Sequence, residues 1–174
     1  MANRKLITIK RGKRYEQDDH DPHGTVAVVS SRGPTGIRLD PVDAAQRYPY
    51  ATRTQPGDVV FRSDHKSPSA WVDPIGGSLL GAPARILRLA STAEVGPHTL
   101  AAIINRLPEA AGDSLSWNVP LLAHSVRELD DVLAAATACE ARLRERQDAI
   151  RDLVGSMINA VVEAAITITG RREH

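Results

Sequence analysis

The chain has 174 residues, of which 42% are hydrophobic and 25% are charged, and its formal net charge is +1. This length and composition indicate one folded core with an appendage and exclude a disordered chain. The near-neutral charge argues against nucleic-acid binding by bulk charge alone, and an aromatic content of 3% argues against a surface that stacks many exposed bases.

The single cysteine, Cys139, cannot form a disulfide within the chain and fits a reducing compartment. It lies in a helical pattern without a nearby histidine, so a packed thiol is favoured over a nucleophile. No apolar stretch follows the basic N-terminal residues as in a secretory signal, and no apolar run approaches the ~20 residues that span a bilayer. We therefore expect a cytoplasmic protein with no membrane segment.

Basic residues gather at the start of the chain, where the first fourteen residues include no acidic side chain. Such a cluster is either a local basic face or a solvated, partly frayed terminus. The cluster consists of Arg4, Lys5, Lys10, Arg11, Lys13 and Arg14.

Short strands separated by glycine and proline are predicted over the first two-thirds of the chain. Residues 5–10 (KLITIK) alternate apolar and polar side chains, and residues 25–30 (TVAVVS) contain a β-branched run, so both are predicted strands. Residues 31–36 (SRGPTG) have the composition of a loop. Residues 41–47 are predicted to form a short helix that a proline opens.

The pattern of strands continues after a turn at residues 55–58 (QPGD), where proline and glycine reverse the chain. Residues 59–62 leave this turn as a strand, and residues 63–69 form a polar loop. Residues 70–80 are predicted to be a hairpin around Asp-Pro-Ile-Gly, and residues 84–89 (ARILRL) are another alternating strand. The sequence therefore predicts an α+β fold with a mixed, mostly antiparallel sheet and short helices.

A short helix is expected to start at Pro97 and to stop at Pro108, because the apolar residues of the segment 99–107 share one face. Residues 109–117 are predicted to be a loop, and residues 119–122 a short extended connector.

The chain then changes character, because Ser125 and Glu128 fit a helix capping box and no proline follows them to about residue 165. About 40 helical residues span roughly 60 Å. Apolar residues recur in alternating steps of four and three, as in a coiled-coil seam, although Glu140 and Gln147 occupy two seam positions. A domain of ~120 residues cannot cover such a stripe, so we expect a partner for it. The seam comprises Leu129, Leu133, Ala136, Leu143, Ile150, Val154, Met157 and Val161.

Catalytic patterns are mostly missing from the sequence. It contains neither the Asn/Asp-Pro-Pro-aromatic loop of an adenine methyltransferase nor a phosphate-binding glycine loop. Asp64 and Lys66, with Asp40 or Asp58 upstream, resemble the carboxylates and lysine of a Mg²⁺-dependent nuclease. The favoured interpretation is a solvated loop whose cations face phosphate.

His20, Asp21 and His23, which follow Asp18 and Asp19, are types of residue that could bind a metal. Their spacing fits neither a helix nor a hairpin that would fix a coordination geometry, so a polar loop is favoured. We expect no catalytic residue, no metal and no cofactor.

Three stretches resemble a known family in their order and spacing. They are residues 56–61 (PGDVVF), residues 70–77 (AWVDPIGG) leading to residues 83–89, and residues 117–121 (WNVPL) before the long helix. Together they resemble the target-recognition half of type I restriction–modification specificity subunits, and also the C-terminal recognition region of N6-adenine DNA methylases. The resemblance covers residues 5–168, but the aromatic-led opening helix of the family is not found.

This resemblance implies a fold and a function. Such subunits have two recognition domains separated by two antiparallel helices, and each domain reads one half of a split DNA site. The helices set the gap between the two halves and dock the methyltransferase subunits. Here it implies one recognition domain at residues 1–122 and one long helix at residues 123–170, which pairs with a second copy or with a methylase. Two-fold pairing would match a palindromic split site.

The function predicted from the sequence is therefore specific binding of double-stranded DNA that directs a partner N6-adenine methyltransferase, without catalysis by this chain. The alternatives are a protein–protein adaptor of a defence system and the small nuclease. Trp71 could pack on a sugar or base, although a lone tryptophan in a strand is more often core. The predicted DNA-binding residues are Arg11, Lys13, Arg14, Ser31, Arg32, Arg62, His65, Lys66, Ser67 and Trp71.

Overall fold

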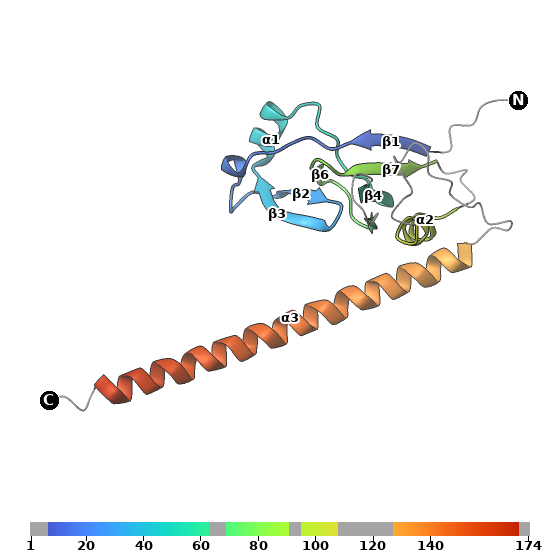
Figure 1. Cartoon of the computed structure of the whole chain (residues 1–174). Coiled ribbons are helices and arrows are strands. Elements are labelled where there is room, and N and C mark those ends of the chain that lie inside the picture. Colours follow the sequence, from blue (N-terminus) through green and yellow to red (C-terminus); the bar gives the residue numbers. More distant parts are fainter. Residues whose placement is uncertain (1–6, 63–68, 91–94, 108–126, 171–174) are drawn as a thin grey trace, which may run out of the picture. The chain divides into compact units, whose positions relative to one another are not determined.

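The computed structural model describes residues 7–62, 69–90, 95–107 and 127–170 of the chain. The chain forms two compact units, residues 1–131 and 132–174, which are considered separately below. The described elements confirm the predicted α+β class with a long C-terminal helix (Figure 1). In chain order they are β1 (Ile7–Arg11), η1 (Gln17–Asp19), β2 (Val26–Ser30), β3 (Gly33–Leu39), α1 (Pro41–Arg47), β4 (Asp58–Arg62), β5 (Ser69–Asp73), β6 (Leu79–Leu80), β7 (Arg85–Leu89), α2 (Pro97–Ile104) and α3 (Arg127–Gly170).

The described residues of the first unit form two sheets where the sequence predicted one. The four-stranded sheet has the order β1-β7-β4-β5, and its neighbouring strands are antiparallel. The three-stranded sheet has the order β3-β2-β6, in which β2 is antiparallel to β3 and parallel to β6. The expectation of mostly antiparallel pairing is confirmed.

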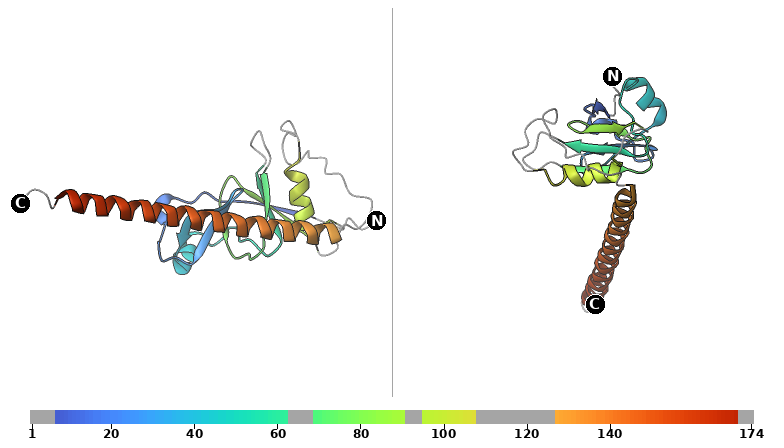
Figure 2. Two further views of the ribbon diagram at one scale, coloured as in Figure 1. Left: turned by 90° about the horizontal axis from the view of Figure 1, so that it is seen from below. Right: turned by 90° about the vertical axis from the view of Figure 1, so that its right-hand side faces the viewer.

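Alternate side chains of the central strands enter different core layers, because successive residues of a strand point to opposite faces. In β4, Val59 and Phe61 pack with α2, whereas Val60 packs with Leu80 of the other sheet. Leu79, beside Leu80 in β6, joins a third cluster that includes Ala44 of α1. The four-stranded sheet therefore has α2 on one face and the smaller sheet on the other (Figure 2).

The two short helices begin as predicted, each with a proline in the first turn. Asp40 caps α1, since its Oδ1 accepts hydrogen bonds from Val42 N at 2.7 Å and Asp43 N at 3.2 Å. The N-cap residue of α2 is Gly96, which has no side chain to cap it. Asp130, within the same compact unit, fills this role by accepting from Thr99 N at 2.7 Å.

The predicted loop at residues 31–36 is wrong, because β3 begins at Gly33, after a turn of two residues. Pro34 is tolerated there because β3 is the edge strand of its sheet, where an N–H can be spared. Gly33 and Gly36 adopt φ of 106° and 81°, which other residues rarely adopt. The loop-like composition thus reflects an irregular edge strand.

The predicted hairpin within residues 70–80 is also wrong. β5 pairs with β4, and β6 belongs to the other sheet, where it pairs with β2. Asp73 redirects the chain between them, because its Oδ1 accepts from Ile75 N at 3.0 Å and Gly76 N at 2.9 Å. The Asp-Pro-Ile-Gly turn is real, but it carries the chain between sheets.

Side chains and loop segments occupy two exposed sheet edges. On β5, the amide of Asn105 accepts from Ala70 N at 2.7 Å and donates to Ala70 O at 2.9 Å. On β3, Arg38 N donates to His20 Nδ1 at 3.1 Å, and Arg38 O accepts from Asp21 N at 2.9 Å. Both edges therefore have backbone groups that are already bonded.

A buried ion pair holds the turn before β4 against β7. The guanidinium of Arg88 donates to both carboxylate oxygens of Asp58, from Nε at 2.8 Å and from Nη2 at 2.7 Å. The Asp58 side chain is only 1% exposed, and its Oδ2 also accepts from Gln55 N at 2.7 Å. This hydrogen bond to Asp58 holds the pKa of Arg88 above its ordinary value. Arg88 Nη2 also donates to Arg53 O, so the pair ties the turn to the sheet.

The long helix is confirmed as α3, whereas the predicted loop, connector and capping serine at residues 109–125 lie outside the described residues. Its polar side chains form local pairs: Arg144 with Glu140 at 3.4 Å and Arg151 with Asp148 at 2.7 Å. These exposed pairs add little stability. None of the described helices is both long and apolar enough to cross a bilayer.

The Asp58–Arg88 pair predicts a large effect of one substitution. Arg88→Met leaves the Asp58 carboxylate buried without its counter-charge, so the free energy of unfolding should fall by roughly 3 kcal/mol in urea denaturation. Adding Asp58→Asn should recover part of this loss, because the amide oxygen still accepts from Gln55 N while the charge is gone. Equal stability of the single and double variants would contradict this account.

Candidate nucleic-acid interface

Arginines lie at neighbouring strand ends of the four-stranded sheet. Arg11, the last residue of β1, is the register partner of Arg85, the first residue of β7. Arg85 in turn lies opposite Phe61, which precedes Arg62 at the end of β4. Three adjacent strands therefore bring cationic side chains to one end of the sheet.

The residues after β1 continue beside the smaller sheet. Lys13 forms a parallel bridge with Gly81, through hydrogen bonds from Lys13 N to Leu80 O at 2.9 Å and from Ala82 N to Lys13 O at 2.8 Å. On its other side, Gly81 N donates to Val29 O at 2.8 Å. The segment that carries Lys13, β6 and β2 thus run in the same direction.

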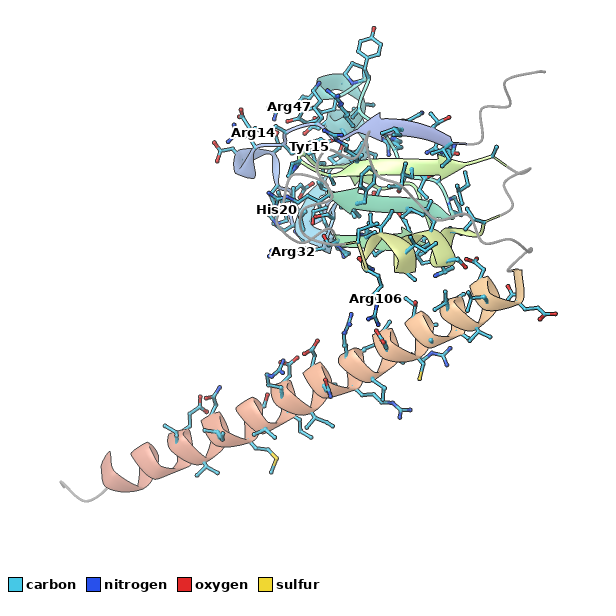
Figure 3. The ribbon with its side chains drawn as sticks, turned by 45° about the vertical axis from the view of Figure 1, so that its right-hand side comes forward. Arg14, Tyr15, His20, Arg32, Arg47 and Arg106 are labelled. Atoms are coloured by element: carbon cyan, nitrogen blue, oxygen red, sulfur yellow. The ribbon has the colours of Figure 1, made fainter. Side chains whose placement is uncertain are left out.

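Arg14 and the turn after β2 therefore lie at the same end of these three parallel segments, with β6 between them. Neighbouring strands lie about 4.8 Å apart, so the two segments are separated by roughly 10 Å. Figure 3 shows Arg14, His20, Arg32 and Arg47 along one side of the first unit, while Arg106, in the turn after α2, lies apart from them.

Hydrogen bonds from Trp71 of β5 and from Ser30 at the end of β2 hold the backbone of the β2–β3 turn. The indole Nε1 of Trp71 donates to Ser30 O at 2.8 Å, which joins the end of β2 to the four-stranded sheet. The Ser30 hydroxyl donates to Gly33 O at 3.1 Å and accepts from Arg32 N at 3.2 Å. Ser31 is buried, whereas the Arg32 side chain is exposed at the turn.

Directly after Arg14 in the sequence, Tyr15 belongs to a cluster with Tyr48 and Asp19. The rings of Tyr15 and Tyr48 meet edge to face with centroids 4.8 Å apart, and Lys13 Nζ lies 5.2 Å from the centre of the Tyr48 ring. The Tyr48 hydroxyl and Arg47 Nη1 each donate to a carboxylate oxygen of Asp19. The hydrogen bond from Tyr48 holds the pKa of Asp19 below its ordinary value, and it raises the pKa of Tyr48. Asp19 thus forms an ion pair with Arg47.

Five of the ten predicted DNA-binding residues lie at the strand ends, the bridge and the turn described above. Arg11, Lys13, Arg14 and Arg32 are exposed there, and among the described residues none of the four has an acidic partner. Arg62 lies beside them, partly buried.

The remaining predicted DNA-binding residues are placed differently. Ser31 is buried, with 7% exposure. Trp71 is half-buried and packs against the cluster between the sheets, so most of its ring contacts protein. His65, Lys66 and Ser67 lie outside the described residues.

Sequence reasoning missed Arg85, which adjoins Arg11 across the sheet. Only the pairing of β1 with β7 brings them together, and nothing local in ARILRL distinguishes this arginine from Arg88. To find Arg85 from the sequence, one would have to predict that β1 pairs with β7.

The residues considered for a metal site do not assemble one. In the part of the chain that the structure describes, no three His, Cys, Asp or Glu side chains come together as metal ligands. His20 Nδ1 accepts from the backbone of β3, and Asp21 Oδ1 accepts from His23 N at 2.8 Å. Both oxygens of Asp58 are bound by Arg88, which argues against its use as a Mg²⁺ ligand. Asp64 and Lys66 lie outside the described residues.

The predicted seam residues fall on α3, apart from this interface in the sequence. Leu133 is partly exposed, Ala136 is exposed, and the other, larger apolar seam residues range from 39% exposure at Leu129 to 68% at Val161. Cys139 is exposed rather than packed within the chain, so the expectation of a packed thiol is wrong for the chain on its own. The larger exposed seam residues are Leu129, Leu143, Ile150, Val154, Met157 and Val161.

Comparison of the sequence with protein-family models and with curated proteins gave no match.

The hydroxyl of Tyr15 predicts a specific response to alkaline pH, because it is buried without a hydrogen-bond partner and burial raises its pKa to about 12. An unfolded chain ionises tyrosine near pH 10. The stability that Tyr15 contributes is therefore present below pH 10 and is lost as the pH rises toward 12. Tyr15→Phe should reduce the fall in melting temperature between pH 9 and 12, relative to the wild type, since the ring packing remains.

Tyr50→Phe is the matched control, because Tyr50 is 94% exposed and the same atom is removed. This variant should melt like the wild type across the same range. An alkaline loss of stability that is unchanged in Tyr15→Phe would show that another group causes it.

Proposed function

We propose that this chain is a non-catalytic module that recognises double-stranded DNA and directs a partner N6-adenine methyltransferase. The observation that supports DNA as the ligand is the convergence of cations from separate chain segments. Arg11 ends β1, Lys13 and Arg14 follow it beside β6, and Arg32 lies on the β2–β3 turn. A polyanion with charges along its length matches such an array, because cations bind phosphates irrespective of base sequence.

A small net charge is consistent with this proposal, because two of the acidic groups of the first unit are already engaged by cations other than those of the interface. Asp19 binds Arg47 and Tyr48, and Asp58 binds Arg88. Asp19 and Asp58 therefore do not neutralise the exposed cations, whose positive electrostatic potential can attract an anionic ligand.

The methyltransferase partner follows from the resemblance to specificity subunits. In that arrangement one recognition domain and one helix make half of a working subunit. A second copy supplies the other half through α3, because the seam has one continuous heptad spacing from Leu129 to Val161 and exposed apolar residues along it. A two-fold pair would place two recognition domains for the halves of a split site.

Salt dependence tests DNA binding by the full chain. The logarithm of the association constant for a mixed duplex pool should fall steeply and linearly with the logarithm of salt concentration. Arg14→Ala should lower the magnitude of this slope by about 0.9, the value for one lost phosphate contact. Arg142→Ala removes the same charge from α3 and should leave the slope unchanged. No binding to any duplex at about 50 mM salt would overturn the proposal and leave the adaptor as the better alternative.

Pairing through α3 predicts a dimer in solution. Leu143→Asp combined with Ile150→Asp places charges in the seam, so light scattering should report the mass of a monomer. Ala141→Asp combined with Ala149→Asp adds the same charges to the same helix outside the seam, and this control should remain a dimer. A wild-type protein with the mass of a monomer would refute pairing with a second copy.

A further inference from the structure

The exposed cations of the interface differ in how firmly their backbone is held. The β2–β3 turn has three side-chain bonds besides its own strand pairing: one from Trp71 to Ser30 O and two made by the Ser30 hydroxyl. Each of these atoms belongs to the turn that carries Arg32 or contacts it directly. The other residue of the turn, Ser31, is buried. Arg32 therefore extends from a backbone that is fixed before any ligand arrives.

The other exposed cations are suited to a less demanding contact. Lys13 and Arg14 follow a strand bridge, and the Lys13 ammonium lies over the Tyr48 ring. A phosphate contact needs positive charge near an oxygen and tolerates several side-chain positions. A base contact is more demanding, because two hydrogen bonds must meet two atoms of one base edge at the same time.

The arginine side chain is suited to a contact with a base edge. Its planar guanidinium presents two parallel N–H donors, which match the O6 and N7 acceptors of guanine in the major groove. Within the described residues, Arg32 has no carboxylate that would occupy those donors. The separation of roughly 10 Å between its turn and the Arg14 segment is comparable with the ~12 Å width of the major groove. Arg32 can thus enter a groove while Arg14 contacts the backbone at its rim.

We propose that Arg32 is a specificity-determining residue that reads a guanine edge, and that Trp71 and Ser30 are positioning residues that fix its turn. This inference rests on the proposed function and deepens it. In this assignment the Trp71 indole acts through Ser30 O and does not stack on DNA. Trp71 therefore affects which sequence is bound through the position of another side chain.

The test begins with selection of bound duplexes from a random pool by the full-length protein. Affinities are then measured for the selected duplex and for duplexes with each single base pair changed. Arg32→Lys keeps the charge but loses the paired donors, so it should bind the selected duplex roughly 5- to 100-fold more weakly and lose preference at one G·C pair. Its salt slope should match the wild type. Arg14→Ala, by contrast, should weaken binding to all duplexes alike and reduce the slope.

Two further variants test the positioning residues. Trp71→Phe removes the indole donor while keeping an aromatic ring in the core, and Ser30→Ala removes the hydroxyl bonds. Each should weaken preference at the same G·C pair as Arg32→Lys, with an unchanged salt slope. The test of Arg32 itself does not depend on these variants, because an exposed arginine can be replaced without disturbing the core.

The outcomes separate this inference from the function on which it rests. If Arg32→Lys keeps the full base preference, or if Arg32→Ala weakens all duplexes equally and lowers the salt slope, Arg32 is a phosphate contact and the inference fails while DNA binding stands. If Trp71→Phe and Ser30→Ala fold normally and keep the preference, the positioning role fails. If the wild-type protein binds no duplex, the proposed function fails first.

Discussion

Burial of the central strands on both faces is the constraint on which the first unit depends. β4 sends Val59 and Phe61 toward α2 and Val60 toward the smaller sheet, and β6 divides Leu79 and Leu80 between two layers in the same way. A slip of one residue would exchange every side chain between layers of different shape, so the register is strongly specified. Fixed registers in turn fix where strands end, and the cationic residues are found at those ends.

The same strand registers place buried acidic residues at one end of the four-stranded sheet and cationic residues at the other. Asp58 and Asp73 are buried partners at one end of β4 and β5, whereas Arg62 and Ser69 are partners at the other end. Asp58 is compensated by Arg88, so the interior tolerates its charge only with this arginine in place. A chain of net charge +1 can therefore present a cationic end, because its buried acids lie at the opposite end of the strands.

Local patterns predicted the elements better than their connections. The proline at residue 41 located α1, a β-branched run located β2, and the turn at residues 55–58 located β4. Alternation located most of β1 and β7, and all these signals lie within a few residues. The partner of β6 could not be predicted, since its pairing with β2 depends on burial between two layers that are distant in sequence. For the interface, the sequence identified Arg11, Arg14 and Arg32 individually, but their shared location follows from the bridge at Gly81. The bond from Trp71 to Ser30 O likewise joins residues 41 positions apart.

The side-chain amide of Asn105 has a consequence for how copies of this protein coexist. It occupies the N–H and C=O of Ala70 as a neighbouring strand would, and the residues around His20 do the same for Arg38 on β3. Exposed strand edges otherwise recruit one another and grow into aggregates, above all where molecules are crowded. If the proposed pairing through α3 and binding to DNA hold, they would raise the local concentration of this protein. The bonded groups of Ala70 and Arg38 make β5 and β3 poorer templates, at these positions, for a strand of another molecule.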